Sequence, residues 1–450
     1  MCRHALPCGL SRQNRLAPIF GNVLRVAVKQ PSLGFERTIL SPTTAITDEF
    51  LPATQNELSR RMAENAQGPA RPIYTVGGRT VVHFGLPLIQ PGISLCTTNL
   101  ARVIDYPARD MTITVEAGIR MEELAKVLAA ERQRLPIDVS QSHRATLGGV
   151  AATNASGSRR FGLGTMRDYV IGVSAVDATG RTFKSGGRVV KNVAGYDLCK
   201  MLVGSRGTLA VMTQFTIKLR PVPESTTILW TTFDRFGMVD QALERLTTSA
   251  ARPVALDLLD ARAAVAVAAD AGLDLPCHRP VLCIGVEGTA RETAWQIETL
   301  KNELMAIGPR ELLPVSDADA TKMWFALAEF QVPSDSPLTF QANLLPSRTV
   351  EFVDAAERAG CTLQAHAGSG IVVGHLPDAI TTDGLAAEIL TRLRGVARQS
   401  RGNLIVVDCD AGWKKSLPLW GDPEPGWPLM QRLKRQLDPE NLLNPHLSFE

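Results

Sequence analysis

The segment from residue 146 to residue 164 most constrains the fold, because it cannot build a hydrophobic core from its own side chains. Its five glycines are separated by small alanine and serine residues: Gly148, Gly149, Gly157, Gly162 and Gly164. Glycine allows a backbone to approach another group closely. Leu147, Val150 and several alanines make the segment too apolar for a flexible linker. We therefore expect it to lie against a flat ligand.

Two other regions are also rich in glycine. One is the loop Val76-Gly77-Gly78-Arg79-Thr80, which follows an expected strand. Consecutive glycines there allow backbone N–H groups to converge on an anion such as a pyrophosphate, and a threonine hydroxyl adds a donor. A tight turn is the alternative explanation for this loop. The other region runs from Gly186 through Asn192 and Tyr196 to residues 204–209.

Length and charge limit the class of protein. A chain of 450 residues fits two or three domains. The formal net charge of +3 is too small to indicate nucleic acid or an anionic membrane as the main partner. We find no apolar run of about 18 residues, so we expect no transmembrane helix.

The cysteines and the first residues point away from several kinds of site. None of the eight cysteines forms a C-x-x-C pair, so the sequence predicts no iron–sulfur or structural zinc site and favours reduced thiols. Residues 1–35 contain basic but no acidic residues, which is typical of a targeting peptide. Three prolines and the lack of a clear apolar stretch favour a disordered segment instead. We treat residues 1–45 as one such N-terminal segment.

Hydrophobic periodicity predicts the elements that follow. We expect helices over residues 55–66 and 121–131, and strands over 71–76, 111–115, 170–177, 181–184 and 209–219. Pro221 and Pro223 end the last strand, which places a domain boundary at about residue 224. The first structured domain is therefore predicted to span residues 46–224.

The rest of the chain contains a loose repeat. Residues 226–315 and 336–409 each predict the order strand, helix, strand, strand, helix, strand, which is that of a ferredoxin-like unit. Two such units would form an α+β domain with antiparallel sheets over residues 225–412. The segment 413–450 contains a predicted helix, residues 428–437, with an apolar face of Leu429, Met430, Leu433 and Leu437.

These motifs together resemble a known family. The combination of Pro136, Thr146–Gly149, Asn154, residues 189–197 and Gly204–Gly207 is similar to the PCMH-type FAD-binding domain of the vanillyl-alcohol oxidase superfamily. Within that superfamily the chain looks most like the FAD-binding subunit of bacterial glycolate oxidase. The resemblance covers about residues 50–450. It implies an α+β protein: an FAD-binding domain of two α/β subdomains, a cap with ferredoxin-like units, and a C-terminal segment that returns to the FAD domain.

The resemblance also implies FAD as the cofactor. The implied contacts are Val76, Gly77, Gly78, Arg79, Thr80, Pro136, Thr146, Gly148, Gly149, Asn154, Gly157, Gly162, Val170, Gly195, Tyr196, Gly204, Gly207 and Asn444. Relatives that attach FAD covalently use a histidine where this chain has Arg79, so we expect non-covalent FAD. A Rossmann site is the alternative, but it needs G-x-G-x-x-G between a strand and a helix, and residues 162–164 lack the third glycine.

A metal site is not expected. His366 and His375 flank a glycine-containing turn that is similar to a histidine segment of metal-dependent D-2-hydroxyacid dehydrogenases in this superfamily. That segment has a second histidine seven residues after the first, and this chain has Val373 there. A working site needs at least three ligands in suitable geometry. A simple turn between two strands is the favoured interpretation.

The catalytic residues are unknown from the sequence. Oxidation of a 2-hydroxy acid needs a base for the hydroxyl proton and a cation for the carboxylate. The resembling subunit often has arginine in a Trp-x-x-Leu-Arg pattern, but here Trp324 is followed at that position by Ala328. Trp324 is either a core residue or a substrate platform. His143 and Arg144 either face the flavin ring or lie on a solvated turn.

The sequence is compatible with three functions. The leading hypothesis is the FAD subunit of a glycolate-oxidase-like dehydrogenase complex, beside a larger FAD subunit and an iron–sulfur subunit. The second is a flavin-binding scaffold or electron-relay subunit that does not oxidise substrate. The third is a self-contained oxidase of another alcohol with O₂ as acceptor. The first implies a cytoplasmic location, or contact with the inner face of a membrane through partner subunits.

Overall fold

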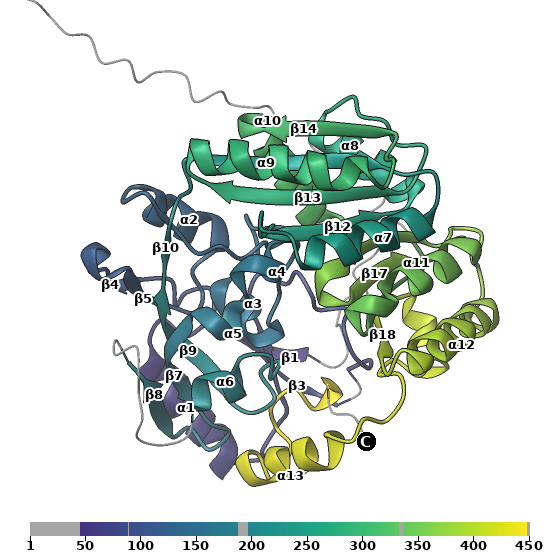
Figure 1. Cartoon of the computed structure of the whole chain (residues 1–450). Coiled ribbons are helices and arrows are strands. Elements are labelled where there is room, and N and C mark those ends of the chain that lie inside the picture. The colour runs from purple at the N-terminus through teal and green to yellow at the C-terminus, as the bar shows by residue number, and fades with distance from the viewer. Residues whose placement is uncertain (1–45, 89, 188–196, 333–335, 448–450) are drawn as a thin grey trace, which may run out of the picture. The chain divides into compact units, whose positions relative to one another are not determined.

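The computed structural model describes residues 46–88, 90–187, 197–332 and 336–447 (Figure 1). Gly195 and Tyr196, two of the expected cofactor contacts, lie outside the described residues. Within these residues there are sheets of three, two, five and eight strands. None of the helices described has both the length and the apolar character needed to cross a membrane.

A small parallel sheet begins the described chain. Its order is β1 (Ile46–Phe50), β3 (Gly92–Cys96), β2 (Ile73–Val76). Helix α1 (Gln55–Gln67) begins where the Thr54 side chain accepts a hydrogen bond from the Glu57 N–H, 3.2 Å away. Leu58 and Met62 of α1 pack in one apolar cluster with Ile73 and Leu95. The predicted helix over residues 55–66 is confirmed to within one residue.

An antiparallel sheet of five strands has the glycine-rich segment 146–164 among its connections. Its order is β4 (Val103–Asp105), β5 (Thr112–Glu116), β9 (Val211–Lys218), β7 (Val170–Val176), β8 (Thr182–Gly186). The helices among these strands are α2 (Met121–Ala129), α3 (Leu147–Thr153), α4 (Arg160–Leu163), α5 (Met166–Tyr169) and α6 (Leu198–Leu202). Two short strands, β6 (Gln133–Arg134) and β10 (Arg220–Pro221), pair with each other beside this sheet.

The C-terminal half forms one eight-stranded antiparallel sheet. The strands are β11 (Ser225–Thr232), β12 (Ala255–Leu259), β13 (Val281–Gly288), β14 (Glu311–Ser316), β15 (Leu338–Asn343), β16 (Thr362–His366), β17 (Ile371–His375) and β18 (Asn403–Cys409). Their order, β14-β11-β13-β12-β16-β17-β15-β18, contains the same arrangement twice. The helices are α7 (Phe236–Thr247), α8 (Ala261–Ala271), α9 (Ala290–Met305), α10 (Asp317–Glu329), α11 (Thr349–Arg358) and α12 (Asp383–Gln399).

This sheet confirms the two ferredoxin-like units and corrects two details of the prediction. The units do not form separate sheets, because β12 and β16 pair side by side, with Asp257 opposite His366. The first unit also contains a helix, α8, between its second and third strands. The second unit has the predicted order.

The two faces of the eight-stranded sheet differ. Leu256 and Leu258 of β12 join the apolar cluster that contains side chains of α7, α9, α11 and α12. The alternate residues Ala255 and Leu259 join a second cluster with α8 and α10. This second cluster contains no residue of β15–β18. On the second face these strands carry polar residues, such as Gln341, which is paired across to Val373.

The chain ends on the small parallel sheet. Helix α13 (Trp427–Leu437) is followed by a β-bridge between Ile73 and Leu443. Leu433 and Leu437 pack against the core of the five-stranded sheet, but Leu429 and Met430 are exposed. The predicted apolar face of this helix is therefore half wrong. Short 3₁₀ helices lie at Ala108–Asp110, Pro346–Arg348, Ala367–Ser369, Ala411–Lys415 and Pro445–Leu447.

Candidate functional site

The loop after β2 packs directly on the chain that leads into α3. A Cβ atom on Gly77 would lie 2.1 Å from the Thr146 hydroxyl oxygen, and one on Gly78 would lie 1.8 Å from the Arg144 carbonyl oxygen. Both distances are far inside van der Waals contact, so only glycine fits. The guanidinium of Arg79 forms an ion pair with Glu49. The structure thus brings the first two glycine-rich regions together.

Helix α3 and the loop Gly204–Gly207 are joined through their backbones. The Thr146 side chain caps α3 by accepting a hydrogen bond from the Gly149 N–H at 3.3 Å. At the other end Asn154 is left-handed, with φ 50°. The Gly204 and Arg206 N–H groups donate to the Ala151 and Ala152 carbonyls at 2.9 and 2.7 Å. A Cβ on Gly204 would lie 3.6 Å from the Cβ of Asn154.

Asn444 connects the C-terminal segment to both of these regions. Its side-chain oxygen accepts a hydrogen bond from the Thr75 N–H at 2.8 Å, and its amide nitrogen donates to the Arg206 carbonyl at 2.9 Å. Its side chain is buried, and its own N–H donates to the Ile73 carbonyl at 2.9 Å. Lys434 adds a second link, because its ammonium donates to the Thr208 carbonyl at 2.9 Å. Asn444 therefore fixes the loop Gly204–Gly207 relative to β2.

Around this junction, three buried polar atoms have no hydrogen-bond partner among the residues that the structure describes. They are the Thr75 hydroxyl, the Asn154 side-chain oxygen and the Ser205 hydroxyl. Buried polar groups in proteins are nearly always paired, and orphaned ones call for a ligand or water. FAD, the cofactor that the sequence implies, carries many donors and acceptors. The residues present therefore fit that group.

Four other residues that we expected to contact the cofactor are packed against protein groups in this structure. Pro136 and Val170 are buried, and Val170 begins β7. A Cβ on Gly157 would lie 2.7 Å from the Asp138 Cβ, and one on Gly162 would lie 2.7 Å from the Val254 Cα. The Gly162 N–H also donates to the Val254 carbonyl at 3.0 Å. The absence of a side chain at these two glycines thus allows close packing, and their role in binding a cofactor stays a prediction.

The two cap histidines are both engaged by protein groups. His366 Nδ1 lies 2.9 Å from the Asp257 carboxylate, which also accepts a hydrogen bond from Ser158 at 2.5 Å. His375 lies 2.9 Å from the Thr339 hydroxyl through Nδ1 and 2.9 Å from the Phe330 carbonyl through Nε2. Burial lowers the pKa of His375. No cluster of three or more His, Cys, Asp or Glu side chains suited to a metal occurs in the described part of the chain.

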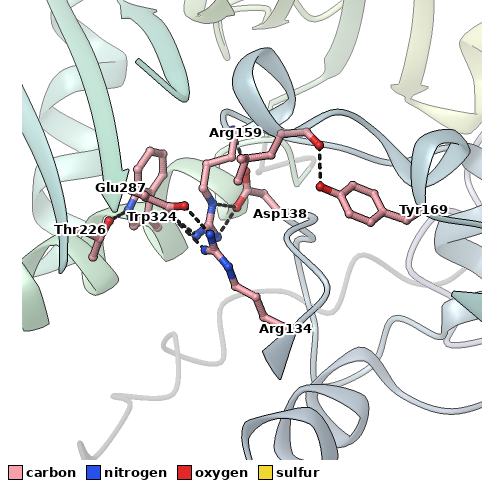
Figure 2. A network of polar contacts seen from close by, with 8 residues as sticks. Arg134, Asp138, Arg159, Tyr169, Thr226, Glu287 and Trp324 are labelled. Carbon is pink, nitrogen blue, oxygen red and sulfur yellow. Dashed lines mark hydrogen bonds and ion pairs between the residues drawn. The ribbon is translucent and has the colours of Figure 1, made fainter. Parts of the chain in front are cut away.

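Trp324 is placed as a core residue. Its ring is 6% exposed, its indole N–H donates to the Thr226 hydroxyl at 2.9 Å, and the Arg159 guanidinium lies 4.9 Å from the ring centre (Figure 2). Ala328, at the position where the resembling subunit often has arginine, lines a cavity of about 450 Å³ next to Trp324. His143 and Arg144 are exposed, as on a solvated turn.

An ion network that sequence reasoning missed lies beside this cavity. Arg159 donates to Asp138 and Glu287, and Arg134 donates to Glu287 through two bonds (Figure 2). The carboxylates of Asp138 and Glu287 are only 3% exposed. Glu287 lies 128 positions from Arg159 and 153 from Arg134, so no local pattern in the sequence points to the network.

Family models match most of the chain. Residues 49–186 match the model described as FAD binding domain. Residues 222–379 and 419–447 match the model described as FAD linked oxidases, C-terminal domain. The chain belongs to the FAD-linked oxidases. FAD is therefore the cofactor of this flavoprotein, as the glycine-rich segments predicted.

Relatives and solved structures agree with this assignment. The FAD-linked oxidase is 27% identical over 425 residues to glycolate oxidase subunit GlcD of Bacillus subtilis, covering 88% of each chain. It is 26% identical to D-2-hydroxyglutarate dehydrogenase of Xanthomonas citri pv. viticola, covering 86% of this chain and 85% of the relative. It is 34% identical to D-lactate dehydrogenase of Archaeoglobus fulgidus over 47% of each chain.

The fold is shared with p-cresol methylhydroxylase, at a TM-score of 0.66 and 14% identity over 89% of this chain and 88% of that chain. It is also shared with alkyldihydroxyacetonephosphate synthase, at a TM-score of 0.62 and 18% identity over 88% of this chain and 76% of that chain.

Replacing Gly78 with alanine should destabilise this FAD-linked oxidase by about 1–3 kcal/mol and weaken its retention of FAD. The reason is that the new methyl group would meet the backbone of Arg144, which cannot move as a side-chain end can. Urea unfolding and the flavin content after desalting measure the two effects. Gly237→Ala is the matched control, since nothing lies within 4 Å of its added Cβ. Equal unfolding midpoints for the two variants would contradict the prediction.

Proposed function

We propose that this chain is the FAD-binding subunit of a glycolate-oxidase-like complex that oxidises a 2-hydroxy acid, glycolate or D-lactate, by hydride transfer to flavin. The observation that carries the proposal is a group of buried polar atoms on Thr75, Asn154 and Ser205, where the glycine-rich segments meet. Within the described ranges these atoms have no hydrogen-bond partner. The relatives named above act, by their names, on glycolate, D-lactate and D-2-hydroxyglutarate. These substrates share a hydroxyl group next to a carboxylate.

The residues of the chain divide into those that hold the cofactor and those that position them. Bound FAD would supply the acceptor for a hydride from the substrate carbon. Thr75, Asn154 and Ser205 offer side-chain oxygens to it, and the backbone of Gly77–Thr80 suits its pyrophosphate. Asn444 keeps the loop of Ser205 in place. We further propose that residues 46–224 and 413–450 hold the cofactor and that residues 225–412 cover it as a cap.

Non-covalent attachment is part of the proposal. At the position where covalent relatives have histidine, Arg79 is engaged in an ion pair with Glu49. A guanidinium stays protonated and has no free nitrogen lone pair to attack the flavin. FAD should therefore be released when the protein is unfolded in acid. Flavin that stays on the denatured chain would contradict non-covalent binding.

The catalytic part of the proposal is tested on the purified full chain loaded with FAD. Anaerobic addition of glycolate or D-lactate should bleach the visible flavin absorption, because hydride transfer needs no other subunit. Each hydroxy acid is compared with its methyl ether, which lacks the hydroxyl proton. If FAD binds but neither acid bleaches it, the chain does not oxidise these substrates.

A non-catalytic scaffold or relay subunit is the second candidate. The observation in its favour is Ala328, which offers no cation at the position where the resembling subunit often has arginine. Trp324 is also buried with its N–H satisfied, so it offers no open platform to a substrate. FAD binding without bleaching would support this function.

We propose a larger FAD subunit and an iron–sulfur subunit as partners of this chain, and a cytoplasmic location. Copurification of the chain with these two subunits would test the partners.

A further inference from the structure

The turn from His83 to Leu86 gathers three basic side chains from distant parts of the chain. The Arg206 guanidinium carbon lies 3.5 Å from the centre of the Phe84 ring. The Lys414 ammonium donates a hydrogen bond to the His83 carbonyl. The Leu86 N–H donates to the His446 carbonyl at 3.1 Å, which fixes His446 beside the same turn. The fold therefore brings two cations and one imidazole to the same turn.

In the described part of the chain, neither Arg206 nor Lys414 forms an ion pair with a carboxylate. Two other inward-facing cations do form such pairs: Arg159 pairs with Asp138 and Glu287, and Lys434 pairs with Asp438. Burial lowers the pKa of Lys414, and the charges of Cys409 and Asp408 act in the opposite direction. Cations that are partly removed from water are costly unless an anion compensates them. The turn thus offers charge that the described protein does not neutralise.

Burial also disfavours the charged forms of Arg206, Lys414 and His446. Burial lowers the pKa of Arg206 to about 10 and also lowers the pKa of Lys414. Burial, together with the charge of Lys414, lowers the pKa of His446 to about 4. The His446 Nδ1 atom is buried and has no hydrogen-bond partner among the described residues. An unused polar atom and two unpaired cations at one turn point to a missing ligand group.

We propose that Arg206, Lys414 and His446 form a binding site for one carboxylate or phosphate group. The guanidinium of arginine and the ammonium of lysine commonly bind carboxylate and phosphate groups in proteins. Arg206 belongs to the loop Gly204–Gly207, so the site adjoins the proposed cofactor site. Two sources offer this chemistry: the carboxylate of a hydroxy acid and the pyrophosphate of FAD. The first source rests on the proposed function, and there the site supplies the cation that Ala328 does not.

The proposed anion site is tested on the full chain from which FAD has been removed. Inorganic pyrophosphate and glycolate are titrated separately at constant ionic strength, and the melting temperature is recorded. At least one of them should raise the melting temperature of the wild type to a plateau. For Lys414→Met, the concentration of the same anion at the midpoint of the titration should be about tenfold higher or more, because a charged hydrogen bond is lost. Arg206→Gln, a second variant, should shift the midpoint in the same direction.

Lys415→Met is the matched control, since Lys415 is exposed one residue along the same turn of helix. It should respond as the wild type does. If the wild type responds to neither anion, or if Lys414→Met and Arg206→Gln respond as Lys415→Met does, the site does not exist. NMR titration adds a readout that needs no ligand: Lys414→Met should raise the pKa of His446, because the neighbouring charge is gone. An unchanged value would contradict the cluster.

The two sources give different results. If pyrophosphate occupies the site, Lys414→Met weakens FAD binding by about tenfold or more and loses the pyrophosphate response. If the substrate carboxylate occupies it, FAD binds Lys414→Met as tightly as the wild type, and the glycolate response is lost. Failure of the flavin to bleach would remove the catalytic proposal but leave these anion titrations of the cofactor-free chain unaffected.

Discussion

Replacing Glu287 with glutamine should reduce the free energy of unfolding by about 3–5 kcal/mol, the cost of breaking a buried ion pair. The Glu287 carboxylate is 3% exposed and lies between two arginines (Figure 2). It accepts a hydrogen bond of 3.0 Å from Arg134 and one of 2.9 Å from Arg159. Glutamine keeps the size of the side chain but offers only one acceptor oxygen and no charge. Arg134 then loses its carboxylate partner, and Arg159 keeps only Asp138.

The loss of stability caused by Glu287→Gln should also depend on pH. Burial alone raises the pKa of Glu287, but the hydrogen bonds from Arg134 and the charge of Arg159 outweigh it, and the net pKa is lowered. A carboxylate with a lowered pKa stabilises the fold above its unfolded value, about 4.3, and loses that contribution as the pH falls through the folded value. The difference between wild type and Glu287→Gln should therefore shrink as the pH falls below about 4.

Urea unfolding at several pH values measures both effects. Glu298→Gln is the control, because Glu298 is 68% exposed and pairs with Lys301 on the surface of α9. Such a surface pair contributes about 0.2–1 kcal/mol. If Glu287→Gln unfolds within about 1 kcal/mol of Glu298→Gln at neutral pH, the network does not hold the N-terminal loops to the eight-stranded sheet.

Local patterns in the sequence predict the elements that have strong periodicity and clear ends. The helix over residues 55–66 and the second ferredoxin-like unit appear in the structure nearly as predicted. Helix α8 was missed because Ala261–Ala271 is mostly alanine, which gives little contrast between a buried and an exposed face. Pairing between β12 and β16 was also missed, since it joins residues more than a hundred positions apart and depends on edge geometry.

The candidate site was predictable where glycine marks it. Gly77 and Gly78 were found from the loop, and the structure gives each a neighbour that excludes a Cβ. Asn444 was found only through the family resemblance. Thr75 and Ser205 gave no signal of their own, because a lone hydroxyl next to a glycine loop is common. Their importance depends on being buried without a partner in the described part of the chain, and only the structure shows this.

Replacing Asn444 with aspartate should weaken FAD binding by roughly tenfold or more and destabilise the protein by about 1–3 kcal/mol. Asn444 has φ 44°, and aspartate tolerates this left-handed conformation nearly as well as asparagine. The variant also keeps the oxygen that accepts from the Thr75 N–H. It loses only the amide donor, so that a carboxylate oxygen faces the Arg206 carbonyl across 2.9 Å. Repulsion between two acceptors should push the loop Gly204–Gly207 away from β2.

Quenching of FAD fluorescence on binding measures the affinity, and urea unfolding measures the stability. Asn302→Asp makes the same chemical change at an exposed position of α9 and should alter neither quantity by much. The two measurements separate a local effect from a general one. Because the moved loop carries Ser205, affinity should fall even under conditions in which Asn444→Asp is fully folded. If the folded variant binds FAD as tightly as Asn302→Asp does, Asn444 stabilises the chain end and does not position the cofactor site.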